Sequence, residues 1–206
     1  MIVTNQDYFL TAVESIIEIS EFTYSKTMLS KTPFLLNDCF VKMSNTQLSQ
    51  LSSQNSAMVI MNVLNTVLEM SNVTYADSTV KLVSVTLSTL NAYQLTVSEI
   101  ESDTEVIYLR SLQEHGVNAQ GNTVKSEVTN SVFSSIVTHL SSSWVIVSSH
   151  ISSFSNVTLS GFSQPPLEIQ SSKIATITNL NLTENDFPVE IIRSEISSIS
   201  NSSFTK

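Results

Sequence analysis

Apolar residues recur along the chain in short clusters separated by serine, threonine and asparagine, and the clusters repeat at a nearly constant distance. The clearest copies lie near the C-terminal end, where residues 166–169 recur as 188–191 and residues 172–174 recur as 194–196. Both pairs of copies are 22 residues apart. A unit of this length with fixed apolar points is typical of one turn of a solenoid.

The pattern extends backwards into nine rows, which are mostly apolar at three points numbered 0, +3 and +8. The rows begin at Ile19, Phe40, Val67, Leu87, Leu109, Phe133, Ile151, Ile174 and Ile196. The segments are short, rich in β-branched residues and largely alternating, which favours strands over helices. We therefore predict an all-β fold, a right-handed parallel β-helix solenoid of about nine coils with roughly 22 residues per coil.

Asparagine occupies the +5 point of five of the nine rows. These residues are Asn45, Asn72, Asn156, Asn179 and Asn201. Asparagine tolerates the left-handed backbone conformation, and its side-chain amide can bond along a stack. The sequence therefore predicts a structural asparagine ladder at a bend between two strands of each coil.

The rows and the ladder together resemble right-handed parallel β-helix proteins of the pectin-lyase-like superfamily, in which asparagines stack at a tight bend. Residues 199–204 and 182–185 also look like the repeats of polymorphic outer-membrane-type and protist surface β-helix proteins. The resemblance covers about residues 15–206. In enzymes of the pectin-lyase type, it places catalytic Asp, Arg or Lys on the outer face of one sheet, often with Ca²⁺.

Composition predicts a hydroxyl-rich surface with few charges. The chain holds 38 serines and 21 threonines, while charged residues make up 13%. The net charge of −9 and the nine scattered basic residues argue against a nucleic-acid partner, because binding the phosphate backbone needs clustered Lys and Arg. No stretch approaches 18 unbroken apolar residues, so we expect no membrane span in this segment. The single cysteine, Cys39, excludes an internal disulfide.

We expect residues 1–14 to form an N-terminal cap or irregular segment, and residues 15–206 to form the solenoid. Apolar residues between Asp7 and Glu18 are spaced partly as in a helix, so the expected N-terminal segment is either a capping helix or an irregular segment. The last row stops in mid-coil at Lys206. We therefore expect the chain to be part of a longer protein, or its end to dock on a partner.

Only one candidate metal site emerges, and no catalytic or cofactor-binding group. Glu99, Glu101, Asp103 and Glu105 alternate, so their carboxylates face the same way in an extended chain and form a weak candidate Ca²⁺ patch. The alternative is a solvated acidic loop. Glu168 and Glu190 share one column of the repeat, but beside no acid–base partner. We expect no cofactor and no enzymatic activity.

Asn-x-Ser/Thr sequons begin at Asn72, Asn156, Asn181 and Asn201. Three of these asparagines belong to the predicted ladder, where we expect a buried side chain that cannot accept a glycan. Asn181 is therefore the better candidate for N-glycosylation in a secreted protein.

The leading functional hypothesis is a non-catalytic structural or adhesive β-helix segment of a larger extracellular or cell-surface protein. Its partners are then other segments of the same protein or neighbouring assembly subunits. One alternative is a carbohydrate-active or carbohydrate-binding domain, because elongated grooves suit polysaccharides. Another is an intracellular assembly component that stacks end to end. A fold alone does not decide among them, because function depends on particular sites.

Overall fold

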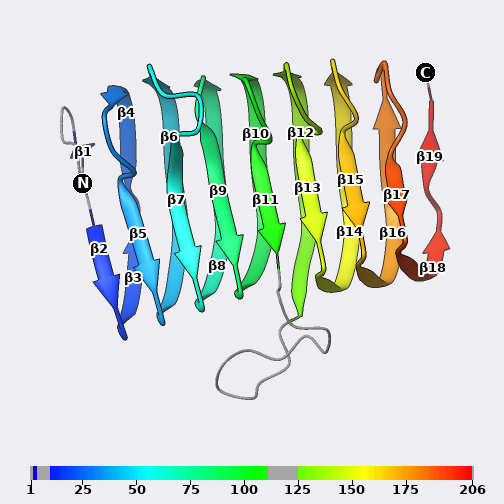
Figure 1. The fold of residues 1–206 in the computed structure, drawn as a ribbon, viewed down its shortest axis with the longest axis horizontal. Helices are drawn as coiled ribbons and strands as arrows, with labels where there is room; N and C mark the ends of the chain where they lie inside the picture. Colours follow the sequence, from blue (N-terminus) through cyan, green and yellow to red (C-terminus); the bar gives the residue numbers. More distant parts are fainter. Residues whose placement is uncertain (1, 4–9, 111–124, 206) are drawn as a thin grey trace.

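The computed structural model describes residues 2–3, 10–110 and 125–205, which wind into a parallel β-solenoid of eight turns (Figure 1). No helix occurs in these described residues. In Figure 1 the chain advances from left to right, while the front strands run down and the strands behind them run up, which is a right-handed winding. The predicted all-β parallel β-helix is therefore confirmed, with a number of turns close to the predicted nine.

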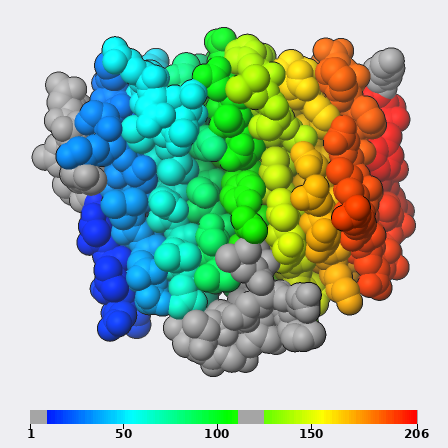
Figure 2. Space-filling view, in the orientation of Figure 1, coloured from blue at the N-terminus to red at the C-terminus, as the bar shows by residue number. Residues whose placement is uncertain are grey.

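Each turn contributes one short and one long stretch of strand to two parallel sheets. The eight-stranded sheet contains β2 (Leu10–Val13), β5 (Phe34–Asn37), β7 (Val59–Leu64), β9 (Lys81–Thr86), β11 (Ile107–Arg110), β13 (Trp144–Val147), β15 (Leu167–Gln170) and β17 (Glu190–Ile192). The eleven-stranded sheet contains β1 (Ile2–Val3), β3 (Ile16–Ser20), β4 (Thr23–Leu29), β6 (Phe40–Ser53), β8 (Val67–Ser78), β10 (Thr89–Ser102), β12 (Ser126–Thr138), β14 (His150–Phe162), β16 (Lys173–Thr183), β18 (Glu195–Ser200) and β19 (Ser203–Phe204). The turns therefore form successive bands of the surface along the axis, as the colours of Figure 2 show.

The predicted repeat at the C-terminal end matches the register of the strands. Ile174 pairs with Ile196, and Ile177 pairs with Ile199. Partners in successive turns lie 21 to 27 residues apart, except across residues 111–124, where they lie 36 or 37 apart. This longer turn explains why nine rows were predicted for eight turns, because a spacing of 36 residues resembles more than one repeat unit.

Four of the nine predicted rows are placed wrongly. Ile19 pairs with Met43, three residues from its predicted partner Phe40, and Leu87 lies at a bend before β10. Leu109 belongs to the eight-stranded sheet, and the other members of its row, residues 112 and 117, lie outside the described residues. Phe133 pairs with Leu159, so it occupies the +8 point. For Ile19, Leu109 and Phe133 the error substitutes one inward apolar residue for another, because every turn has several. Leu87 is instead a partly exposed residue at a left-handed bend.

Each turn bends at up to three points where the backbone is left-handed. The positions with positive φ form three columns. The first contains Glu14, Asp38, Asn65, Leu87, Ser148, Ser171 and Arg193; the second contains Glu21, Asn45, Asn72, Gln94, Asn130, Asn156, Asn179 and Asn201; the third contains Lys26, Gln50, Asp77, Glu99, Ser135, Gly161 and Glu184. Such a φ is uncommon for residues other than glycine, although Asn and Asp adopt it more readily than the others. Within the described residues, 21 non-glycine positions adopt it.

Serine and threonine satisfy the backbone beside these bends. The residue after a bend points into the core, and its hydroxyl accepts the N–H of the equivalent residue in the preceding turn. Thus Ser172 Oγ accepts from the N–H of Ser149 at 3.0 Å and donates to the carbonyl of Gln170 at 2.8 Å. Thr66 does the same for Cys39 and Leu64. Because buried backbone groups need partners, this explains part of the high serine content.

The core is a stack of apolar columns between the two sheets. One column runs through Leu48, Tyr75, Val97, Phe133, Leu159 and Leu182. Trp144, on β13, packs edge to face against Phe133 at 4.9 Å and Phe154 at 5.6 Å between ring centroids. Burial raises the pKa of the Tyr75 hydroxyl, which donates to the carbonyl of Val80. Such stacking gives the rigid interior typical of solenoids.

The N-terminal segment differs from the predicted cap. Leu10–Val13 forms β2, the terminal strand of the eight-stranded sheet, and Ile16–Ser20 forms β3. Strands thus occupy the described part of the region in which the spacing had suggested a helix. Ile2–Val3 pairs with Thr23–Tyr24 of β4, and residues 4–9 lie outside the described part of the chain. Parallel strand pairing therefore extends into the described part of residues 1–14.

Candidate binding surfaces

The five predicted ladder asparagines all occupy the second bend column, with φ near +50°. Asn72 Nδ2 donates to Asn45 Oδ1 at 2.8 Å, and Asn179 Nδ2 donates to Asn156 Oδ1 at 2.7 Å. Sequence reasoning missed Asn130, to which Asn156 donates at 2.9 Å. The misplaced row of Phe133 hid it, although correct alignment on Val128 puts Asn130 in the column.

The ladder lies on the outer surface. Asn45, Asn72, Asn156 and Asn201 are exposed, and Asn179 is partly exposed. The prediction of buried ladder side chains is therefore wrong, because the left-handed bend turns the side chain outward. All four sequon asparagines, Asn181 included, are exposed. Burial therefore does not distinguish Asn181 from the other three sequon asparagines as the glycosylated residue.

A face without charge lies between the second and third bend columns. We call it the hydroxyl face and define it by two columns of outward residues. The first is Thr23, Gln47, Thr74, Thr96, Val132, Thr158, Asn181 and Ser203. The second is Ser25, Ser49, Ala76, Ser98, Ser134, Ser160 and Thr183. Eleven of these fifteen residues carry a hydroxyl, and none is charged or buried.

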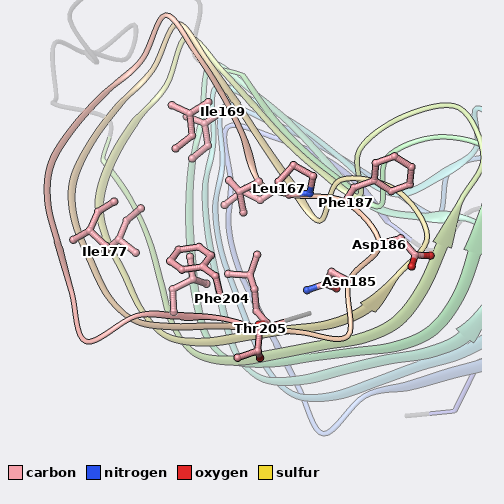
Figure 3. Close-up of a pocket in the computed structure, with 14 residues that line it drawn as sticks. Leu167, Ile169, Ile177, Asn185, Asp186, Phe187, Phe204 and Thr205 are labelled. Carbon is pink, nitrogen blue, oxygen red and sulfur yellow. The ribbon is translucent and has the colours of Figure 1, made fainter.

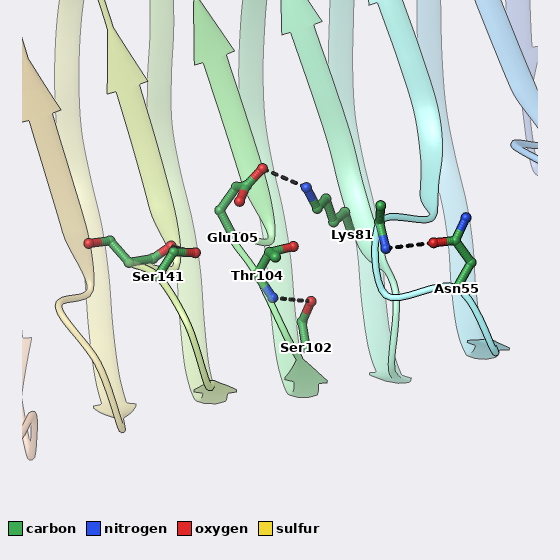
Figure 4. Close-up of polar contacts among 8 residues, drawn as sticks. Asn55, Lys81, Ser102, Thr104, Glu105 and Ser141 are labelled. Atoms are coloured by element: carbon green, nitrogen blue, oxygen red, sulfur yellow. Dashed lines mark hydrogen bonds and ion pairs between the residues drawn. The ribbon is translucent and has the colours of Figure 1, made fainter.

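The four acidic residues of the candidate Ca²⁺ patch contact different partners. Glu105 Oε1 lies 2.7 Å from Lys81 Nζ (Figure 4), and Glu101 Oε1 lies 3.4 Å from His139 Nε2. Glu99 is hydrogen-bonded to Asp77 of the preceding turn, and this bond and the like charge of Asp77 raise the pKa of Glu99. Within the described ranges, no three His, Cys, Asp or Glu side chains are grouped to hold a metal ion.

A groove of about 410 Å³ crosses the outer side of the eleven-stranded sheet, before the asparagine ladder. Lys42, Glu69, Asn91 and Glu127 occupy successive turns of one column along it. Tyr93, with 46% of its surface exposed, presents its ring beside this column. An exposed aromatic ring flanked by planar polar side chains is suited to a flat, hydroxylated ligand.

An apolar cavity of about 430 Å³ lies at the last turn (Figure 3). Leu167, Ile169 and Ile177 form its inner wall, and Phe204 points into it. Phe204 is 61% exposed, whereas its partner in the preceding turn, Leu182, is 4% exposed. The difference arises because each inner turn is covered by the next one, so the last turn presents core residues and unpaired strand edges to solvent.

These features define the class: the chain is a parallel β-solenoid protein with a hydroxyl-rich exterior. No family model matches the chain, and a search of the curated proteins finds no match for it either. The described residues form no helix that is long and apolar enough to cross a membrane.

Proposed function

We propose that the chain is a non-catalytic structural or adhesive segment of a larger extracellular or cell-surface protein, related to the pectin-lyase-like β-helices. The observation that carries the proposal is the hydroxyl face, which stays free of charge through all eight turns. The stacked core beneath it supplies a stiff support, because each turn is held by parallel strand pairing on two sheets.

The composition of this face favours a contact surface over a merely solvated one. A solvated surface usually carries interspersed Lys, Arg, Glu and Asp. Hydroxyl groups both donate and accept hydrogen bonds, and they lose less on desolvation than charges do. With about 4.8 Å between strands, eight turns present an array roughly 34 Å long. Such an array suits an extended, uncharged partner surface.

The adhesive role is tested by coating beads with the chain and measuring their retention on a panel of immobilised glycans and matrix proteins. The variant Thr96→Lys/Thr158→Lys places two charges on the hydroxyl face, and we expect it to lower retention. The matched control is Ser155→Lys/Ser200→Lys, which places two charges, also two turns apart, on the other side of the ladder. Equal retention of both variants and the wild type would refute the adhesive role of this face.

The extracellular placement has a separate test. The native protein would be isolated from its source and its four sequons analysed by mass spectrometry. N-glycans on Asn72, Asn156, Asn181 or Asn201 support passage through the secretory pathway, which the exposure of all four residues permits. A fully unmodified native chain that fractionates with the cytosol contradicts the placement.

A second candidate function, carbohydrate binding or cleavage, rests on the groove beside Tyr93. Stacking of a sugar ring on Tyr93 with hydrogen bonds to Glu69 and Asn91 is the arrangement that the groove offers. Isothermal titration with neutral and acidic oligosaccharides, with Tyr93→Ala as the variant, tests binding, and product analysis tests cleavage. Binding that Tyr93→Ala leaves unchanged argues against the groove.

End-to-end assembly is a third candidate, and the apolar last turn favours it. Self-association through this surface predicts a solution mass that rises with protein concentration. Phe204→Asp places a charge in the cavity and is expected to abolish the rise. A mass that stays monomeric at all concentrations refutes this candidate.

A further inference from the structure

Three basic residues lie in one outward column of the eleven-stranded sheet. His150 pairs with Lys173 of the next turn. Lys125 precedes Ser126, which pairs with Ile151, so Lys125 occupies the same column one turn before His150. We call Lys125, His150 and Lys173 the cationic column. The same column carries apolar residues in the first turns, Ile16, Phe40 and Val67.

The accumulation of like charge is costly without a counter-charge. Side chains in register on neighbouring strands lie about 5 Å apart, and like charges there destabilise the sheet. The chain has 18 acidic residues for nine basic ones, yet no acidic group of the described chain forms an ion pair with Lys125 or His150. Glu195 meets only the outer end of the column, 3.6 Å from Lys173 Nζ.

The lowered pKa of His150 is consistent with positive charge on both sides of it. Partial burial lowers the pKa of His150, and the charges of Lys125 and Lys173 lower it further. The lowered pKa favours the neutral imidazole, which offers one N–H donor between the two lysines. A bound anion would reverse part of this shift, because it neutralises the charges that cause it.

The backbone at this place is also irregular. The register between β12 and β14 shifts after the pair Ser126–Ile151, where β14 contains one extra residue, Ser152. A β-bulge re-aims the neighbouring side chains and is over-represented beside binding sites. The bulge directly follows the positions of Lys125 and His150, so the column lies where the sheet changes its geometry.

We propose that the cationic column is a binding site for a sulfate or phosphate group, held between the ammonium groups of Lys125 and Lys173 with His150 as a hydrogen-bond donor. The backbones of the two lysines lie about 10 Å apart, two strand spacings, and a lysine side chain is long enough to span that gap from either side of the shorter histidine. Tetrahedral oxyanions suit such point charges, and charge-assisted hydrogen bonds are the strong ones. The site is independent of the hydroxyl face.

The test follows the imidazole of His150 by NMR during pH titration of the full chain. Sodium sulfate or phosphate should raise the pKa of His150 in a saturable manner, while His139 in its separate ion pair serves as an internal reference. Sodium chloride at equal ionic strength controls for screening. We expect Lys173→Gln to weaken the sulfate affinity about tenfold, the scale of one charge-assisted hydrogen bond.

The variants keep the test independent of folding. The double variant Lys125→Gln/Lys173→Gln should abolish the sulfate-dependent rise in the pKa of His150. The pKa of His150 without sulfate should be higher in this variant, because the two repelling lysine charges are gone. Lys173 has 70% of its side chain exposed, so the single variant stands in if the double variant does not fold. Lys26→Gln is the matched control, because Lys26 is an exposed lysine of the third bend column and should leave sulfate binding unchanged.

Two sources of the oxyanion are distinguished by comparing free sulfate with dextran sulfate, with dextran as the control. A response to dextran sulfate at much lower sulfate concentration identifies a polymer-borne group, and an equal response identifies the free ion; either supports the site. The proposal is overturned if chloride reproduces the shift, if the double variant retains it, or if neither source produces one.

Discussion

The asparagine ladder is most directly tested at Asn156, which is bonded on both sides. Its Nδ2 donates to Asn130 Oδ1 at 2.9 Å, and its Oδ1 accepts from Asn179 at 2.7 Å. The residue also holds a φ of 53°. Asn156→Ala removes both hydrogen bonds and places a Cβ without a polar group in the left-handed conformation. Asn156→Gly removes the same bonds but fits that conformation without strain.

The two substitutions separate two contributions to the free energy of unfolding. Two exposed side-chain hydrogen bonds contribute about 1 kcal/mol together, at the low end of their usual range. The left-handed conformation costs alanine about 1–2 kcal/mol, so Asn156→Ala should destabilise by about 2–3 kcal/mol. Glycine replaces that strain with about 0.5 kcal/mol of unfolded-state entropy, so Asn156→Gly should cost about 1.5 kcal/mol.

The assay is urea unfolding followed by the fluorescence of Trp144. This is the only tryptophan of the chain, and its strand, β13, belongs to the same turn as Asn156 on β14. The probe therefore reports the perturbed turn even where a solenoid does not unfold as one unit. Equal losses in both variants would remove the strain argument. Losses below about 0.5 kcal/mol in both, the size of an ordinary surface substitution, would refute a stabilising ladder altogether.

Three further predictions follow from single positions, each measured by the same urea unfolding. Ser172→Ala leaves the buried N–H of Ser149 without its partner and should destabilise by about 1–3 kcal/mol, with Ser172→Thr as the conservative control; an unchanged midpoint contradicts the assigned role. Leu87→Asn relieves a bulky residue at a φ of 51° and should stabilise by about 1 kcal/mol, whereas a loss of stability shows that the leucine packs favourably. Glu99→Gln should stabilise the protein at pH 7 but not below pH 4.5, the ordinary pKa of glutamate. The raised pKa of Glu99 means that its hydrogen bond with Asp77 stabilises the native state in the protonated form, and this stabilisation is lost as the pH rises. A stability change that does not depend on pH contradicts this coupling.

The fold was predictable from sequence wherever the turns have equal length. Residues 151–204 repeat at 22 to 23 positions, and their predicted partners are the observed ones. The alignment failed between Leu87 and Phe133, because residues 111–124 lengthen one turn and apolar residues also face inward from the eight-stranded sheet. A hydrophobic period indicates that a residue points inward, but it does not indicate which of the two sheets the residue belongs to. The serines after the bends, such as Ser149 and Ser172, are the more specific register signal.

The candidate surfaces were less predictable than the fold. Sequence located the asparagine ladder but placed its side chains inside, because an alternating pattern does not include a left-handed bend that turns one residue outward. The cationic column was predictable only in part. His150 and Lys173 directly precede Ile151 and Ile174, which the predicted rows align correctly. Lys125 was hidden because the row of Phe133 was misplaced, so only the strand register puts it in the column.

The outer columns change character along the axis while the inner columns stay apolar, and this separation has a consequence for function. The column that carries Ile16, Phe40 and Val67 in the first turns carries Lys125, His150 and Lys173 later. Inward residues are constrained by packing against both neighbouring turns, whereas an outward residue contacts only its column neighbours. A charge placed outward therefore costs little stability unless it meets a like charge, so the fold does not require three basic residues in one column. This is the reason for testing the cationic column as an anion-binding site.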